Sequence, residues 1–136
     1  MKNATFLELK TNQRNQLLDI MPQIGSFLRE HQAIDGVLVI FVPHTTAAVT
    51  INENADPDVK NDILSYLSRL IPADAGFRHM EGNSDAHIKS SLVSPSLSIL
   101  VSGGKVVLGT WQSVFFCEFD GPRTRKLYLK YIPDPA

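Results

Sequence analysis

Residues 36–42 read Gly-Val-Leu-Val-Ile-Phe-Val, a continuous apolar run rich in β-branched side chains. A run of this kind, with no polar residue to face water, is typical of a strand that is buried on both faces. Pro43 and His44 follow it and end the strand. We therefore predict that these residues form the central strand of a sheet.

The other elements follow from periodicity and from turn residues. Pro22 and Pro57 each fit the first turn of a helix. Two apolar runs on either side of the Gly103-Gly104 pair indicate a β-hairpin. The remaining predicted strands are 4–10, 16–20 as a partner of the first, 46–52, 96–101, 106–108, 109–119 and 127–132, and the predicted helices are 21–34, 57–71 and 85–92, the last with Ser84 as its N-cap.

Two of these elements carry predictions about their contacts. Along 57–71, apolar side chains recur at helical spacing and are expected to face the core: Val59, Ile63, Tyr66, Leu67 and Leu70. Along 109–119, alternation puts one set of side chains on one face (Trp111, Phe115, Cys117, Phe119) and a second set on the other (Val114, Phe116). Both faces of this strand need cover, by a helix and by a second sheet or a neighbouring subunit.

The composition indicates one globular domain over residues 1–136, since 43% of the residues are hydrophobic and 20% are charged. A formal net charge of −1 gives no overall basic field, so neither a nucleic acid nor a membrane is an expected partner. Cys117 is the only cysteine, which excludes an internal disulfide and fits a reducing compartment. With no signal segment or membrane span in view, we expect a cytoplasmic protein.

The densest group of chemically capable side chains lies between residues 79 and 92, His-Met-Glu-Gly-Asn-Ser-Asp-Ala-His-Ile-Lys-Ser-Ser-Leu. It contains two imidazoles, two carboxylates, an amide and an ammonium group on a loop that leads into a short helix. Asp85 and Lys89 are four residues apart and can pair along one helix face. This clustering favours a functional site, and the alternative is a helix start with polar residues on a solvated surface.

Histidines offer the next part of the chemistry. His44 follows the predicted central strand, beside the hydroxyl groups of Thr45 and Thr46, and Glu53 lies a few residues further on as an acid or base. Three imidazoles, His44, His79 and His87, can form a catalytic zinc-type site with an open fourth position. Without a metal ion, the same residues can serve as acid, base and anion-binding groups.

The only concentrated positive charge follows the Asp120-Gly121-Pro122 turn, at Arg123, Arg125 and Lys126. Two guanidinium groups can hold a phosphate or carboxylate by paired hydrogen bonds. The alternative is a sheet edge that is protected by charge. The sequence lacks a P-loop, a dinucleotide-binding glycine motif and a nucleophile elbow, so those classes of enzyme are not expected.

Three stretches together, residues 43–59, 79–92 and 108–125, closely resemble the YjbQ family, described as secondary thiamine-phosphate synthase enzymes. The resemblance covers nearly the whole chain. It implies a compact α+β fold with a mostly antiparallel β-sandwich core, flanking helices and a homotrimeric assembly. It also implies a thiamine-phosphate synthase-like transferase that joins a pyrimidine diphosphate to a thiazole phosphate and releases pyrophosphate, as a secondary activity.

The family's motif residues fall on His44, on His79, on Glu81, Gly82, Asn83, Asp85, Ala86 and His87, and on Asp120, Gly121, Pro122, Arg123 and Arg125. On this basis His44, His79 and His87 are expected to bind a divalent ion, zinc or magnesium, or else the phosphate of a small phosphorylated metabolite. Thr45, Asn83, Arg123 and Arg125 would bind the substrate. Glu53, Asp85 and Lys89 would position groups or carry protons.

Two other functions remain open from the sequence. One is a trimeric binding module that captures a small anionic metabolite without changing it. The other is a metal-dependent hydrolase of phosphate esters.

Overall fold

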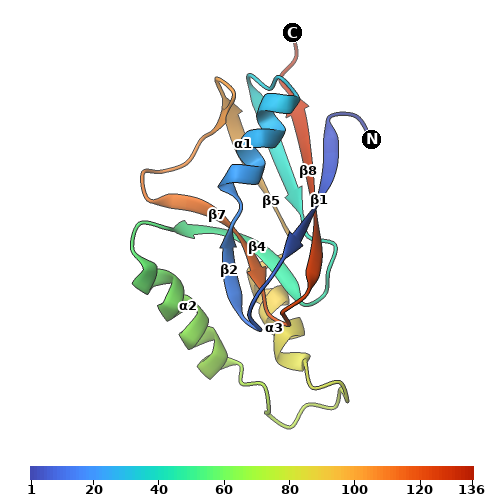
Figure 1. Cartoon of the computed structure of the whole chain (residues 1–136), viewed down its shortest axis with the longest axis vertical. Helices are drawn as coiled ribbons and strands as arrows, with labels where there is room; N and C mark the ends of the chain where they lie inside the picture. Colours follow the sequence, from blue (N-terminus) through green and yellow to red (C-terminus); the bar gives the residue numbers. More distant parts are fainter.

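The computed structural model describes residues 1–136 as an α+β fold with two antiparallel sheets and three helices (Figure 1). The predicted β-sandwich core with flanking helices is confirmed. In chain order the elements are β1 (Ala4–Lys10), β2 (Gln16–Asp19), α1 (Met21–Glu30), β3 (Gly36–Phe41), β4 (Ala47–Glu53), α2 (Pro57–Leu70), α3 (Ser84–Val93), β5 (Ser96–Ser102), β6 (Lys105–Val106), β7 (Gln112–Glu118) and β8 (Thr124–Pro133).

The larger sheet has the strand order β1-β8-β3-β5-β6, and the smaller sheet has the order β2-β7-β4. Strand β3 lies between β8 and β5, so its predicted central position is confirmed. Its predicted burial on both faces is wrong, because Val37 and Val39 are only half-buried and Phe41 is exposed. An apolar run thus predicts that a strand is central in its sheet, but it does not show that both faces of the sheet are covered.

The main core fills the space between the two sheets and contains 18 buried residues. Strand β7 supplies Val114 and Phe116, and α1 supplies Ile24, Phe27 and Leu28. Full burial of one such side chain contributes roughly 1.5–3 kcal/mol. This core holds the two sheets face to face and so fixes the relative positions of the loops at their ends.

A second, smaller cluster lies on the other face of the small sheet. There Ala48, Cys117 and Phe119 pack against Ala86 of α3. Both faces of β7 are therefore covered, one by the second sheet and the other by α3, as predicted. Trp111 does not share that buried face, because it precedes β7 and is exposed.

Helix α2 packs less deeply than predicted: none of its residues is buried, although Val59, Ile63 and Leu67 are half-buried and Leu67 packs against the second cluster. Tyr66 is 60% exposed and Leu70 is 59% exposed. The helical spacing of apolar residues shows that a helix has an apolar side, but not what covers that side. In Figure 1, α2 lies at one side of the small sheet and leads into the long connection to α3.

Strand pairing was also predicted incorrectly at the N-terminus. Strand β1 pairs with β8, and β2 pairs with β7, so the two strands belong to different sheets. The connection over residues 11–15 crosses from one sheet to the other, which strand periodicity cannot reveal. Helix α3 begins at Ser84 with Asn83 in the N-cap position, one residue earlier than predicted.

None of the three helices combines the length and the apolar character that crossing a lipid bilayer would demand.

Candidate functional site

A cavity of about 760 Å³ opens where three connections meet. One connection joins β3 to β4, the second leads into α3, and the third is the turn between β7 and β8. The polar residues that line the cavity are His44, Thr45, Thr46, His79, Glu81, Asn83, His87, Asp120, Arg123 and Arg125. The structure therefore brings together His44, His79 and His87, which are distant in the sequence, with Thr45, Asn83 and both predicted arginines.

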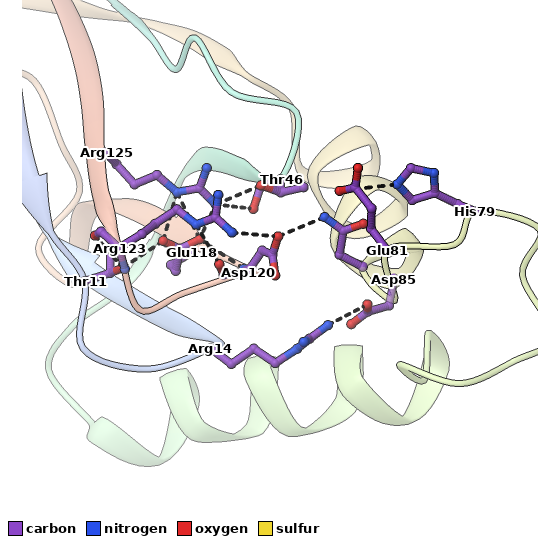
Figure 2. A network of polar contacts seen from close by, with 11 residues as sticks. Thr11, Arg14, Thr46, His79, Glu81, Asp85, Glu118, Asp120, Arg123 and Arg125 are labelled. Carbon is purple, nitrogen blue, oxygen red and sulfur yellow. Dashed lines mark hydrogen bonds and ion pairs between the residues drawn. The ribbon is translucent and has the colours of Figure 1, made fainter.

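Arg125, which lines the cavity, forms a buried ion pair with Glu118 (Figure 2). Arg125, whose side chain is 3% exposed, donates from Nε to Glu118 Oε1 at 2.9 Å and from Nη2 to Glu118 Oε2. Glu118 is 0% exposed. Its carboxylate also accepts from the Thr11 hydroxyl at 2.8 Å and from the Asp120 backbone N–H at 3.0 Å. A carboxylate with this many donors can stay charged without water.

Burial and hydrogen bonding have opposite effects on the pKa of Glu118. Burial alone would raise the pKa, but the hydrogen bonds from Arg125, from the Asp120 backbone and from Thr11 outweigh it and hold the pKa below its usual value. Glu118 therefore remains an anion at neutral pH and keeps Arg125 in place.

Arg125 is only partly used by these contacts. Its Nη2 also donates to the Thr46 hydroxyl oxygen at 2.8 Å and to the Thr46 carbonyl at 3.2 Å. Its Nη1 has no hydrogen-bond partner in the chain and is not among the buried unpaired atoms. Because Arg125 lines the cavity, Nη1 is left as a donor for a ligand.

Arg123 and Asn83 are joined through Asp120. Arg123 is 49% exposed; it donates from Nη2 to Asp120 Oδ2 at 3.0 Å and from Nε to the Asp120 carbonyl at 2.9 Å. Asn83 Nδ2 donates to the same Asp120 Oδ2 at 2.9 Å. This contact replaces a side-chain cap of α3, and it leaves Asn83 Oδ1 buried without a partner. The turn between β7 and β8 is thus tied to the start of α3 (Figure 2).

His44 is oriented by the backbone. Its Nε2 accepts from the Lys126 N–H at 2.8 Å, so in the neutral ring the proton lies on Nδ1. Burial of the ring and then the nearby charge of Arg125 hold the pKa of His44 below 6.5. His44 is therefore a neutral donor through Nδ1 at pH 7.

A pH dependence of stability follows from His44. As the pH falls below 6.5, the unfolded chain binds a proton at this position before the folded chain does. The contribution of His44 to the free energy of unfolding is therefore complete above pH 6.5, and it is lost as the pH falls from 6.5 to the lower pKa of the folded state. The free energy of unfolding of the wild type should therefore drop more between pH 7 and about pH 5.5 than that of His44→Gln. Urea titrations at a series of pH values measure this difference. Equal slopes in the two proteins would contradict it.

The other two histidines of the cavity lie close to each other. The rings of His79 and His87 meet edge to face, with centroids 5.5 Å apart, and His79 Nε2 lies 3.7 Å from Glu81 Oε2. His79 and Glu81 belong to a connection, residues 72–82, that makes no backbone–backbone hydrogen bond with the rest of the chain. A carboxylate beside two imidazoles can take up or release protons next to a bound ligand.

These donors do not form a metal centre. No three histidine, cysteine, aspartate or glutamate side chains lie where they could share one ion. In addition, the lone pair of His44 Nε2 is already used by the Lys126 N–H, while a metal ligand needs that lone pair free. The predicted metal site at His44, His79 and His87, for zinc or magnesium, is therefore not assembled.

Asp85 and Lys89, predicted to be catalytic, do not line the cavity. Both are 1% exposed. Asp85 accepts from Lys89 Nζ at 3.2 Å and from Arg14 Nη2 at 2.8 Å, and Lys89 also donates to Asn15 Oδ1 at 3.2 Å. These contacts attach α3 to the connection between β1 and β2. These contacts suit the pair to holding α3 in place.

Glu53 also lies away from the cavity. It ends β4, whereas His44 lies before the start of that strand at Ala47. Six strand residues at about 3.3 Å each separate the two ends of β4 by roughly 20 Å. The prediction rested on closeness in the sequence, which an extended strand does not preserve.

Sequence analysis did not identify two residues of the hydrogen-bond network around Arg125, namely Glu118 and Thr11. Glu118 was detectable, since alternation puts it on the same face of β7 as Val114 and Phe116, and a buried carboxylate requires a nearby cation such as Arg125. Thr11 was not detectable, because its contact depends on how residues 11–15 cross between the sheets.

Comparison with known proteins matches nearly the whole chain to one family. Residues 5–134 match the family model described as UPF0047 protein YjbQ-like. A UPF0047 protein of Methanocaldococcus jannaschii is 59% identical over 93% of this chain and 92% of its own length. The UPF0047 protein YugU of Bacillus subtilis is 50% identical over 93% of this chain and 96% of its own length.

Solved structures agree. An uncharacterised YjbQ/UPF0047 family protein of Clostridium acetobutylicum superposes with a TM-score of 0.92 at 48% identity, covering 94% of this chain and 99% of that chain. A hypothetical protein of Aeropyrum pernix superposes with a TM-score of 0.91 at 36% identity, covering 96% of this chain and 98% of that chain.

These comparisons correct the predicted thiamine-phosphate synthase-like activity. The relatives are named as UPF0047 proteins, and the solved relatives are described as uncharacterised or hypothetical. None of these names or descriptions includes a transferase reaction, so the comparisons contradict the prediction that this chain is such a transferase.

Proposed function

Because this chain belongs to the UPF0047 family of YjbQ-like proteins, whose relatives are named without a reaction, we propose its function from the cavity itself: it binds a small phosphorylated metabolite. The observation that carries this proposal is the free Nη1 of Arg125, which Glu118 holds beside Arg123 and the neutral donor His44.

The donors suit a phosphoryl group. Guanidinium groups match phosphate oxygens in geometry and charge, and hydrogen bonds to a charged acceptor contribute about 1.5–3 kcal/mol each. Thr45 lines the same cavity, and its hydroxyl makes no hydrogen bond within the chain. A volume of about 760 Å³ falls within the usual size of metabolite pockets. Phosphate recognition therefore supplies an anchor, with space left for the rest of a metabolite.

A chemical step at the bound phosphorylated compound is a second part of the proposal. His79, His87 and Glu81 line the cavity close to one another, which puts three groups that can carry protons beside the bound compound. Phosphorus NMR of the protein mixed with phosphate esters tests this part. New product resonances would support an enzyme, and unchanged resonances would limit the function to binding.

Arg123→Ala tests the binding site directly. Arg123 is half exposed, so its loss should leave the fold intact and weaken the binding of inorganic pyrophosphate about tenfold, which corresponds to about 1.4 kcal/mol. Isothermal titration calorimetry measures the affinity.

Arg29→Ala is the matched control for this experiment, because Arg29 is an exposed arginine on α1 away from the cavity. It should bind pyrophosphate like the wild type. Equal affinities of Arg123→Ala and Arg29→Ala would contradict the proposed site.

We also propose that three copies associate, as the family resemblance implies. The exposed apolar side of α2 supports association, because Tyr66 and Leu70 remain in water in a single chain. Sedimentation equilibrium should give about three times the chain mass of 15.1 kDa, and Tyr66→Lys should lower it. A wild-type mass of one chain would contradict this proposal.

A further inference from the structure

A second hollow of about 260 Å³ adjoins the main cavity. The two share four lining residues, His44, Thr45, His87 and Pro95, which form the ridge between them. Liquid water occupies roughly 30 Å³ per molecule, so the smaller hollow has space for a chemical group rather than for a single ordered water.

The chemistry of the smaller hollow differs from that of the main cavity. It contains no arginine, lysine, aspartate or glutamate, whereas Arg123, Arg125, Glu81 and Asp120 line the main cavity. An uncharged hollow offers nothing to a second phosphate.

Hydroxyl groups dominate its polar surface. Ser90 Oγ donates to the Thr45 carbonyl at 2.6 Å, and Ser91 Oγ donates to the His87 carbonyl at 2.8 Å. Both donors are therefore used, and the oxygen atoms keep lone pairs that can accept. The Thr45 hydroxyl and the His87 ring form no hydrogen bond within the chain, so they can both donate and accept. A surface that offers both hydrogen-bond donors and acceptors, without charge, is suited to bind the hydroxyl groups of a neutral ligand.

We propose that this hollow is a subsite for the uncharged, hydroxylated part of the ligand, so that the protein's metabolite is a phosphorylated sugar or polyol. The proposal rests on the proposed phosphate site. The phosphoryl group lies at Arg123 and Arg125, and the hydroxyl-bearing chain crosses the ridge at His44 and His87 to reach Ser90 and Ser91.

The test compares three probes by calorimetry: inorganic phosphate, propyl phosphate and ribose 5-phosphate. In the wild type, ribose 5-phosphate should bind at least tenfold more tightly than propyl phosphate, because only the sugar offers hydroxyl groups to the hollow. Ser91→Leu fills the hollow from an exposed position and should remove that difference. Ser98→Leu, the same change at an exposed serine of β5 outside the hollow, should keep it.

Each outcome is decisive. Absence of binding by all three probes would overturn the proposed phosphate site itself. Binding of phosphate with equal affinities for propyl phosphate and ribose 5-phosphate would overturn the subsite alone. A preference for the sugar that persists in Ser91→Leu would assign the hydroxyl recognition to another part of the cavity and overturn this inference.

Discussion

Replacing Glu118 with alanine should lower the free energy of unfolding by about 3–5 kcal/mol. Glu118 is fully buried, and the change leaves the Arg125 guanidinium buried with only Thr46 as a partner. In a buried ion pair, the attraction between the charges offsets the free energy that both lose on leaving water. When one charge is removed, the desolvation penalty of the other is no longer offset, and the folded state is destabilised. Guanidinium chloride titration followed by circular dichroism measures the loss.

Two further variants separate this cause from a general packing effect. Glu8→Ala removes an exposed carboxylate from β1 and should change stability by less than about 0.5 kcal/mol. The double replacement Glu118→Leu with Arg125→Met removes both charges and should recover most of the loss. If Glu118→Ala is as stable as Glu8→Ala, the buried pair does not have the energetic role that we assign to it.

Replacing Asp85 with alanine should have an effect of similar size, about 3–5 kcal/mol. The change leaves Lys89, which is also buried, with only the Asn15 side chain as a polar partner, and it removes the contact with Arg14. Because Asp85 lies in the first turn of α3, its loss should also free the N-terminal end of that helix from the β1–β2 connection. Thermal and denaturant unfolding measure the change.

The comparison with Asp62→Ala, an exposed aspartate of α2, controls for the removal of one negative charge. The double variant Asp85→Leu with Lys89→Met should be more stable than Asp85→Ala, since it leaves no buried charge unpaired. A stable Asp85→Ala variant that lost only turnover would restore the catalytic role that the sequence suggested.

Most elements could be predicted from the sequence, because the signals were local. Pro22 and Pro57 marked the helix starts, Gly103-Gly104 marked a hairpin, and the apolar run at 36–42 marked the central strand. Strand pairing could not be predicted at β2, since it depends on a connection that crosses between sheets. The exposure of α2 could not be predicted either, because periodicity does not identify what covers a helix.

In the candidate site, too, some residues could be predicted from local sequence signals and others could not. Residues at strand ends and turns, such as His44 and Arg123, line the cavity, because loops at one end of a sandwich converge. Asp85 and His87 show the limit of counting residues along the chain. Two positions apart on a helix they differ by about 200° around its axis, so both cannot face the cavity. His87 faces it, and Asp85 with Lys89 turns toward the β1–β2 connection.

The two sides of the cavity differ in how firmly they are held. Thr11 binds Glu118 and Arg123, and Gly121 lies against residue 13 so closely that an added Cβ would be 2.2 Å from the Gln13 carbonyl oxygen. The arginine side is therefore preorganised, and a ligand there loses little conformational entropy to the protein. The side with His79 and Glu81 lacks such ties. The arginine side should thus determine the affinity for the ligand. The rearrangement of the side with His79 and Glu81 around the ligand should determine how long the ligand stays bound.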